Sequence, residues 1–103
     1  MLVPKQQEVY YAVFFETFYD SLEDAVSKAP EVIAAHRARS QEWHARDTLL
    51  MAGAFHNNPE EKLRTMAICT TREAAEEYAG GDPFVLNGMV STWYIRQWAN
   101  MFA

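Results

Sequence analysis

The sequence has little cysteine and no residue pattern typical of a metal site. Its single cysteine, Cys69, excludes an internal disulfide and a zinc site built on paired thiolates. Its histidines, His36, His44 and His56, lack a metal-ligand spacing such as His-x-x-x-His. We therefore expect no metal, and we interpret Cys69 as a small apolar residue.

Long apolar runs are also lacking, and none is long enough to span a bilayer. The N-terminal segment Met-Leu-Val-Pro-Lys-Gln-Gln-Glu has neither the basic region nor the apolar region of a signal peptide. We therefore expect a cytoplasmic protein in a reducing compartment.

Positive charge is scarce. Lysine and arginine together number 9 against 14 aspartate and glutamate residues, which gives a formal net charge of -5. The one local basic cluster, Arg37, Arg39 and Arg46, is interrupted by Glu42 and Asp47. Nucleic acids and anionic membranes bind clustered lysine and arginine, so we expect neither as a partner.

Apolar and aromatic side chains are abundant, at 50% and 14% of the residues. A chain of 103 residues has room for one domain with one core, and no linker or repeat divides it. We expect a single domain over residues 1–103, with residues 1–7 as a frayed lead-in.

The sequence pattern predicts four strands and two helices. The strands are aromatic and β-branched stretches at residues 8–16, 48–55, 63–70 and 89–98. The helices are expected at residues 30–46, beginning at Pro30, and at residues 72–79, between an N-cap at Thr71 and a stop at Gly80-Gly81. One helical turn at 20–29, a turn at 56–61 and a loop opening at Asp82-Pro83-Phe84 complete the prediction. The order βαββαβ indicates an α+β fold of the ferredoxin-like type with a four-stranded antiparallel sheet.

Both faces of this sheet are apolar. In the first strand, Val13 and Phe15 point to one side, while Ala12 and Phe14 point to the other. Two helices can cover only one face, so the second face predicts a homodimer in which two sheets pack face to face about a two-fold axis. The alternative is that these residues are edge exposures that need no partner.

His36 is the first candidate for chemistry. It lies on the apolar stripe of the helix at 30–46, between Ile33 and Ser40, so it points at the sheet. One interpretation is a core histidine bonded to a backbone carbonyl. The other is a general acid or base, the usual role of imidazole near neutral pH. His44 is about 80° further around the helix and is expected at the rim or surface.

Asp82 is the second candidate, placed between the Gly-Gly pair and Pro83. One interpretation is a turn aspartate that bonds its own backbone. The other is a carboxylate that orients His36 and stabilises its charged form. Sequence spacing alone does not show that the two side chains meet.

These residues resemble the YCII-related (YciI-like) family, over most of the chain from the first strand to Phe102. The family pattern has a helix with an internal His, a further His, and an Ala-Gly in the next strand. It continues with an acidic, Ala-rich helix ending in Asp-Pro-Phe, then a Gly, a late Trp and a Phe. The corresponding residues are His36, His44, Ala52-Gly53, Asp82-Pro83-Phe84, Gly88, Trp98 and Phe102. Each element is weak alone, but their order and spacing together are specific.

The resemblance implies a dimeric α/β barrel with a pocket in which the helix His and the Asp before Pro form a catalytic pair. Those roles fall on His36 and Asp82. Many members carry an Arg shortly before the His, where this chain has Lys28-Ala29-Pro30, so the anion-binding role of that Arg has no counterpart here. Many also end the first helix with Gly, where this chain has Asp47.

One branch of the family resembles chlorohydroxyquinone dehydrochlorinases, and the broader barrel superfamily includes muconolactone isomerases and small monooxygenases. We therefore expect a cofactor-independent lyase or isomerase acting on a small cyclic or aromatic metabolite, in which His36 moves a proton and Asp82 orients its imidazole. The substrate-binding side chains expected around this pair are Ser40, Phe14, Phe84 and Trp93. The alternatives are a non-catalytic ligand-binding or accessory dimer and a cofactor-free monooxygenase of the same barrel type.

Overall fold

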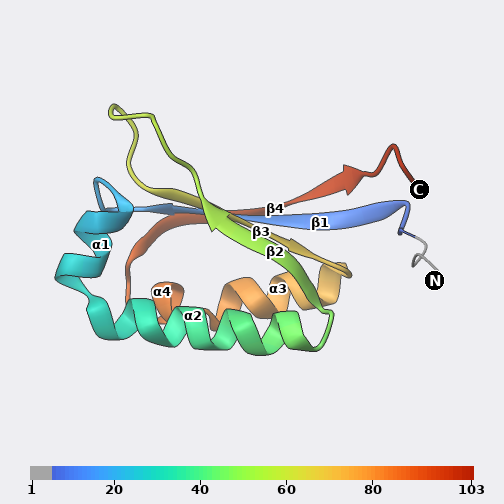
Figure 1. Ribbon diagram of the computed structural model, residues 1–103, viewed down its shortest axis with the longest axis horizontal. Coiled ribbons are helices and arrows are strands. Elements are labelled where there is room, and N and C mark those ends of the chain that lie inside the picture. The colour runs from blue at the N-terminus through green and yellow to red at the C-terminus, as the bar shows by residue number, and fades with distance from the viewer. Residues whose placement is uncertain (1–5) are drawn as a thin grey trace.

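The aromatic and β-branched stretches of the sequence form one antiparallel sheet in the computed structural model, which describes residues 6–103 (Figure 1). The strands are β1 (Val9–Thr17), β2 (Leu49–Ala54), β3 (Arg64–Cys69) and β4 (Val90–Ala99), in the order β2-β3-β1-β4. This order confirms the predicted ferredoxin-like α+β fold with its four-stranded antiparallel sheet. The first five residues of the expected lead-in lie outside the described part of the chain.

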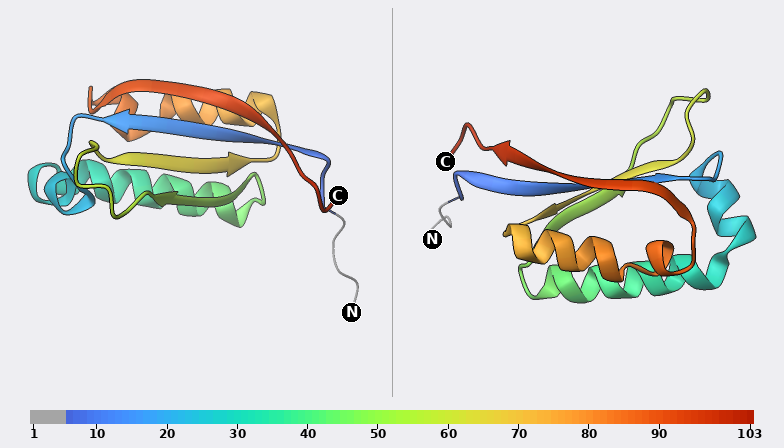
Figure 2. Two further views of the ribbon diagram at one scale, coloured as in Figure 1. Left: turned by 90° about the horizontal axis from the view of Figure 1, so that it is seen from above. Right: turned by 180° about the vertical axis from the view of Figure 1, so that it is seen from behind.

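The helices are α1 (Leu22–Lys28), α2 (Pro30–Ala45), α3 (Arg72–Gly81) and α4 (Pro83–Leu86). Figures 1 and 2 show α2, α3 and α4 beneath one face of the sheet, while α1 leads from the end of β1 into α2. Within residues 6–103, no helix combines the length and the apolar character needed to cross a membrane.

The segment at 20–29 contains more helix than the single turn expected there. Ser21 caps α1, because its side chain accepts a hydrogen bond from the Asp24 amide at 3.0 Å. Ala25 is buried, and Leu22 packs on the core. The acidic composition of this segment concealed the short apolar face that holds α1 in place.

The region around Asp82 also differs from the prediction. Gly80 and Gly81 do not stop α3, which remains helical through Gly81. The helix ends because Asp82 takes an extended conformation before Pro83, a residue that disfavours helical geometry in its predecessor. Asp82 and Pro83 then open the short helix α4 as its N-cap and first residue, where a loop was expected.

The core fills the space between the helices and the sheet. Tyr78 of α3 is almost completely buried and stacks on Phe15 of β1, with ring centroids 6.3 Å apart. Trp43 of α2 meets the Tyr78 ring edge-on at 5.4 Å. These aromatic contacts tie both long helices to the central strand, and they fix the orientation of the α2 face that carries His36.

No helix of residues 6–103 covers the opposite face of the sheet (Figure 2). On it Phe14 stacks on Tyr94, its partner across β1 and β4, with ring centroids 5.0 Å apart. Met51 and Trp98 are 62% and 50% exposed. The apolar second face predicted from the alternation in β1 is therefore present, and its pairing with a second copy remains a prediction.

Candidate functional site

A cavity of about 290 Å³ lies between α2 and the helix-covered face of the sheet. The polar side chains in its lining are His36, Arg37, Ser40, Gln41, Thr65 and Tyr78. Apolar side chains complete it, among them Val13, Phe15, Ile33, Leu63 and Phe84. Its small volume and mixed lining suit a ligand built on a single ring.

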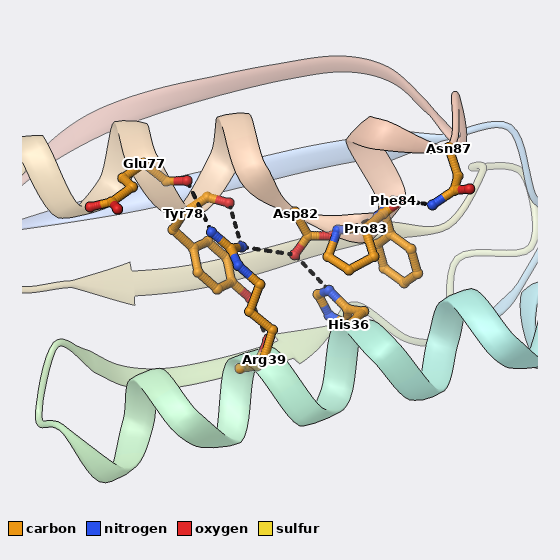
Figure 3. A network of polar contacts seen from close by, with 9 residues as sticks. His36, Arg39, Glu77, Tyr78, Asp82, Pro83, Phe84 and Asn87 are labelled. Carbon is orange, nitrogen blue, oxygen red and sulfur yellow. Dashed lines mark hydrogen bonds and ion pairs between the residues drawn. The ribbon is translucent and has the colours of Figure 1, made fainter.

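His36 reaches this cavity from the middle of α2. Its Nδ1 lies 2.7 Å from Oδ2 of Asp82, and its side chain is 17% exposed (Figure 3). The imidazole also stacks on the Phe84 ring, with centroids 4.1 Å apart and planes 13° from parallel. Two contacts therefore fix the ring, one in its plane and one on its face.

Asp82 is fully buried, and both of its carboxylate oxygens have partners. Oδ1 accepts a hydrogen bond from the Phe84 amide at 2.8 Å and so caps α4, while Oδ2 faces His36. The Arg39 guanidinium lies 4.0 Å from Oδ2. A buried carboxylate is costly unless it is paired and hydrogen-bonded, and this one has both kinds of contact.

The contact with Asp82 determines which nitrogen of His36 is free. When the Asp82 carboxylate is ionised and the imidazole is neutral, Nδ1–H donates to Oδ2 and Nε2 keeps the lone pair. No hydrogen bond involves Nε2, and every buried side-chain nitrogen or oxygen in residues 6–103 has a partner, so Nε2 is open to solvent. His36 lines the cavity, so an imidazole held in this tautomer by the carboxylate can act as a base there.

Arg39 lies next to Asp82 and is itself held by several contacts. Its guanidinium donates to the backbone carbonyls of Tyr78 at 2.9 Å and Glu77 at 3.1 Å (Figure 3). It also lies over the Trp43 ring, 4.8 Å from the ring centroid. It thus satisfies carbonyls at the end of α3 and places a positive charge near Asp82.

Ser40 and Tyr78 form a second polar group at the cavity. The Ser40 Oγ and the Tyr78 hydroxyl are 2.7 Å apart. Burial raises the pKa of Tyr78 to about 12, with a smaller opposing effect of the Ser40 hydrogen bond, so this hydroxyl is protonated at neutral pH.

Two of the four expected substrate-binding residues lie beside His36, and two do not. Ser40 and Phe84 line the cavity. Phe14 points to the uncovered face of the sheet, where it stacks on Tyr94. Trp93 is opposite Phe15 in the register of edge strand β4, but it is 40% exposed and lines no part of the cavity.

The remaining candidates stay outside the site. His44 is exposed, and its Nδ1 contacts the Leu49 carbonyl at 2.8 Å, which ties the end of α2 to β2. Burial raises the pKa of Cys69 to about 11, so this thiol supplies no thiolate at neutral pH. No group of three or more His, Cys, Asp or Glu side chains within residues 6–103 could hold a metal ion.

Sequence reasoning missed Arg39 and Tyr78. Arg39 lies off the apolar stripe of α2, but its long side chain carries the guanidinium back over Asp82. Its position one turn after His36 was the available signal. The bond between Tyr78 and Ser40 joins α3 to α2, two helices far apart in the sequence, so no local pattern predicts it.

Comparison with known proteins gives one family and a shared fold. The sequence profile of the YCII-related domain matches residues 10–99. No curated protein sequence matches the chain.

Several solved structures share the fold. The 5-chloro-2-hydroxyhydroquinone dehydrochlorinase of Burkholderia phenoliruptrix, in complex with 2,5-dihydroxybenzoquinone, is 11% identical with a TM-score of 0.63, over 88% of this chain and 94% of that one. A protein of unknown function from Nitrosomonas europaea is 11% identical with a TM-score of 0.53, over 92% and 90%. A Mycobacterium tuberculosis protein is 14% identical with a TM-score of 0.51, over 90% and 94%. At these identities the likeness is one of fold.

Proposed function

The chain belongs to the YCII-related domain family, and from this premise we propose that it is a cofactor-independent lyase or isomerase acting on a small cyclic or aromatic metabolite. The observation that carries the proposal is the 2.7 Å contact between His36 and the fully buried Asp82 at the wall of a ring-sized cavity. A core histidine would instead bond a backbone carbonyl and line no cavity.

In the proposed reaction, Nε2 of His36 removes a proton from a carbon of the bound ring. The imidazole becomes positively charged, and the Asp82 carboxylate stabilises that charge through Nδ1–H. The proton then returns to another atom of the ring in an isomerisation. In a lyase reaction, the electron pair left behind instead expels a leaving group. Phe84 stacks on the ring of His36, so the imidazole keeps one orientation throughout.

The shape of the cavity and the fold both support a cyclic substrate. Apolar side chains and Phe84 line much of the space, which favours a flat, mostly apolar molecule. The dehydrochlorinase that shares this fold is in complex with 2,5-dihydroxybenzoquinone, a single-ring molecule of this kind.

The test is proton exchange. Cyclohexanone in deuterated water near neutral pH should incorporate deuterium beside its carbonyl faster with the protein than without it, as followed by proton NMR. His36→Gln and Asp82→Asn should each lower the protein-dependent rate at least about 100-fold, the usual contribution of a positioned acid or base. Asparagine is also a good N-cap, so Asp82→Asn keeps the start of α4.

The matched control is His44→Gln, which changes a histidine on the same helix that contacts the Leu49 carbonyl and does not line the cavity. It should leave the exchange rate unchanged. Exchange that persists in His36→Gln would contradict the proposal. Oxygen consumption without exchange would point to the monooxygenase alternative, and ligand binding with neither would point to a binding protein.

A further inference from the structure

The hydroxyl groups of Ser40 and Tyr78 hold one more hydrogen than their mutual contact uses. Two hydroxyls carry two hydrogens, and the 2.7 Å bond between them uses one. Neither hydroxyl has another hydrogen-bond partner within residues 6–103. Both side chains line the cavity, so one O–H donor is left to point into it.

The acidities of the two groups indicate which hydrogen is left. A phenol is a stronger acid than an alkyl hydroxyl, so Tyr78 is the better donor and Ser40 the better acceptor of the shared bond. Tyr78 is 1% exposed, whereas Ser40 is partly exposed on the cavity side of α2. The Tyr78 hydrogen therefore goes to Ser40, and the Ser40 hydrogen is free for a ligand.

This donor lies at a useful distance from the base. Ser40 follows His36 by one turn of α2, so the two side chains project from the same helix face about 6 Å apart along the axis. A single-ring ligand spans that separation. Its carbon can meet Nε2 of His36 while an oxygen on the neighbouring ring atom meets the Ser40 hydroxyl.

We propose that Ser40 donates a hydrogen bond to a ring carbonyl of the substrate, that Tyr78 positions this donor, and that the substrate is therefore an enolisable cyclic ketone. This inference rests on the proposed function, because it assigns the oxygen of the same ligand. His36 takes the proton from the carbon beside the carbonyl, and the C–H electron pair becomes the new C=C bond. The carbonyl π pair moves to the oxygen, where the Ser40 hydroxyl stabilises the negative charge of the enolate.

The experiment measures the carbonyl directly. Cyclohexanone labelled with carbon-13 at its carbonyl should show a downfield shift of that carbon on binding, because a hydrogen bond polarises the C=O group. Ser40→Ala should abolish the shift and weaken cyclohexanone binding about 3- to 10-fold, the range expected for one hydrogen bond. Binding of cyclohexene, which has no oxygen, should be unchanged. Ser40→Thr keeps a hydroxyl and should restore the shift.

Tyr78→Phe tests the positioning role. It should reduce the carbonyl shift without abolishing it, because Ser40 keeps its hydrogen but loses the partner that orients it. Ser91→Ala and Tyr94→Phe, which change residues outside the cavity, should leave the shift at its wild-type value. A carbonyl shift that is absent in the wild type, or that survives in Ser40→Ala, would overturn the inference.

The two proposals fail in different ways. His36→Gln should stop deuterium exchange and keep the carbonyl shift. A wild type that shows the Ser40-dependent shift but no exchange would contradict the proposed function and leave the carbonyl donor standing. If exchange depends on His36 but no Ser40-dependent shift is seen, the carbonyl donor is contradicted and the proposed function stands.

Discussion

Asp82 uses its two carboxylate oxygens for two purposes, and this explains much of the site at the scale of single residues. Oδ1 starts α4, and Oδ2 orients His36, so the same buried side chain fixes a helix and an imidazole. The sequence offered these two roles as alternative interpretations of Asp82. The structure combines both contacts in one residue, and the turn-type bond to its own backbone holds the carboxylate in place for His36.

The pairing of His36 with Asp82 could not be predicted from the residues alone. His36 lies in α2 and Asp82 lies between α3 and α4, and only the packing of α2 against α4 brings them together. The family resemblance supplied this pair, whereas helical periodicity supplied only the direction in which His36 points. Arg39 was missed because helical periodicity gives only the direction in which a side chain leaves the helix, whereas a long side chain can bend back toward another face.

The raised pKa values of Tyr78 and Cys69 predict that the protein loses stability at alkaline pH. Burial raises the pKa of Cys69 from 9.0 to about 11 and of Tyr78 from 10.0 to about 12. The folded state therefore holds both protons more tightly than the unfolded state. The free energy of unfolding consequently falls as the pH rises from about 9 to 12. Each group should lower the free energy of unfolding by about 2–3 kcal/mol across that range.

Urea unfolding at a series of pH values should show this decline. Tyr78→Phe removes the tyrosine contribution, so its decline should be about half as large as that of the wild type. Parallel curves for the two proteins would show that Tyr78 does not titrate in this way.

At the scale of helices and strands, the sequence correctly predicted a helix start that one capping residue determines. It placed the end of the same helix wrongly, because two possible end signals lie next to each other there. The N-cap of α3 at Thr71 is confirmed by its hydrogen bond to the Ala74 amide at 3.0 Å. The Gly-Gly pair looked like a stop signal, but neither glycine takes a positive φ there. The pair Asp82-Pro83 carried the real signal, an N-cap followed by a proline at the first helical position.

The two glycines at the end of α3 should respond differently to alanine. A Cβ at Gly80 would meet nothing within 4 Å, so Gly80→Ala should stabilise the exposed helix by about 0.5–1 kcal/mol. A Cβ at Gly81 would lie 2.8 Å from Nη2 of Arg39, whose guanidinium is held by two carbonyls. Gly81→Ala should therefore gain no stability and should lower the exchange rate by displacing Arg39.

Urea unfolding and the exchange assay measure both effects, with Gly80→Ala as the control for helix propensity. Equal stabilisation by the two changes, with full exchange activity in both, would show that Arg39 does not hold the site in place.

At the scale of the whole molecule, the sheet separates two kinds of surface. Its covered face carries the core and the cavity, and its other face carries exposed aromatic and aliphatic side chains. Alternation along β1 assigned residues correctly to two sides, but it could not say which side holds the cavity. Phe14 was therefore expected in the pocket and lies on the opposite face, while Trp93 lies at the edge.

We expect the uncovered face to form a homodimer. Met51 and Trp98 are 62% and 50% exposed on it, and the same face carries the stacked pair of Phe14 and Tyr94. A soluble protein rarely leaves so many large apolar side chains on one continuous face, and a second copy of the same face buries them symmetrically.

Light scattering at micromolar concentration should give the mass of two chains. Trp98→Glu should shift the protein toward monomer or aggregate, because it places a charge in the buried interface. Leu86→Glu is the matched control, since Leu86 is 69% exposed on α4, on the helix side of the molecule. It should leave the mass unchanged, and a wild type that stays monomeric at this concentration would rule out the dimer.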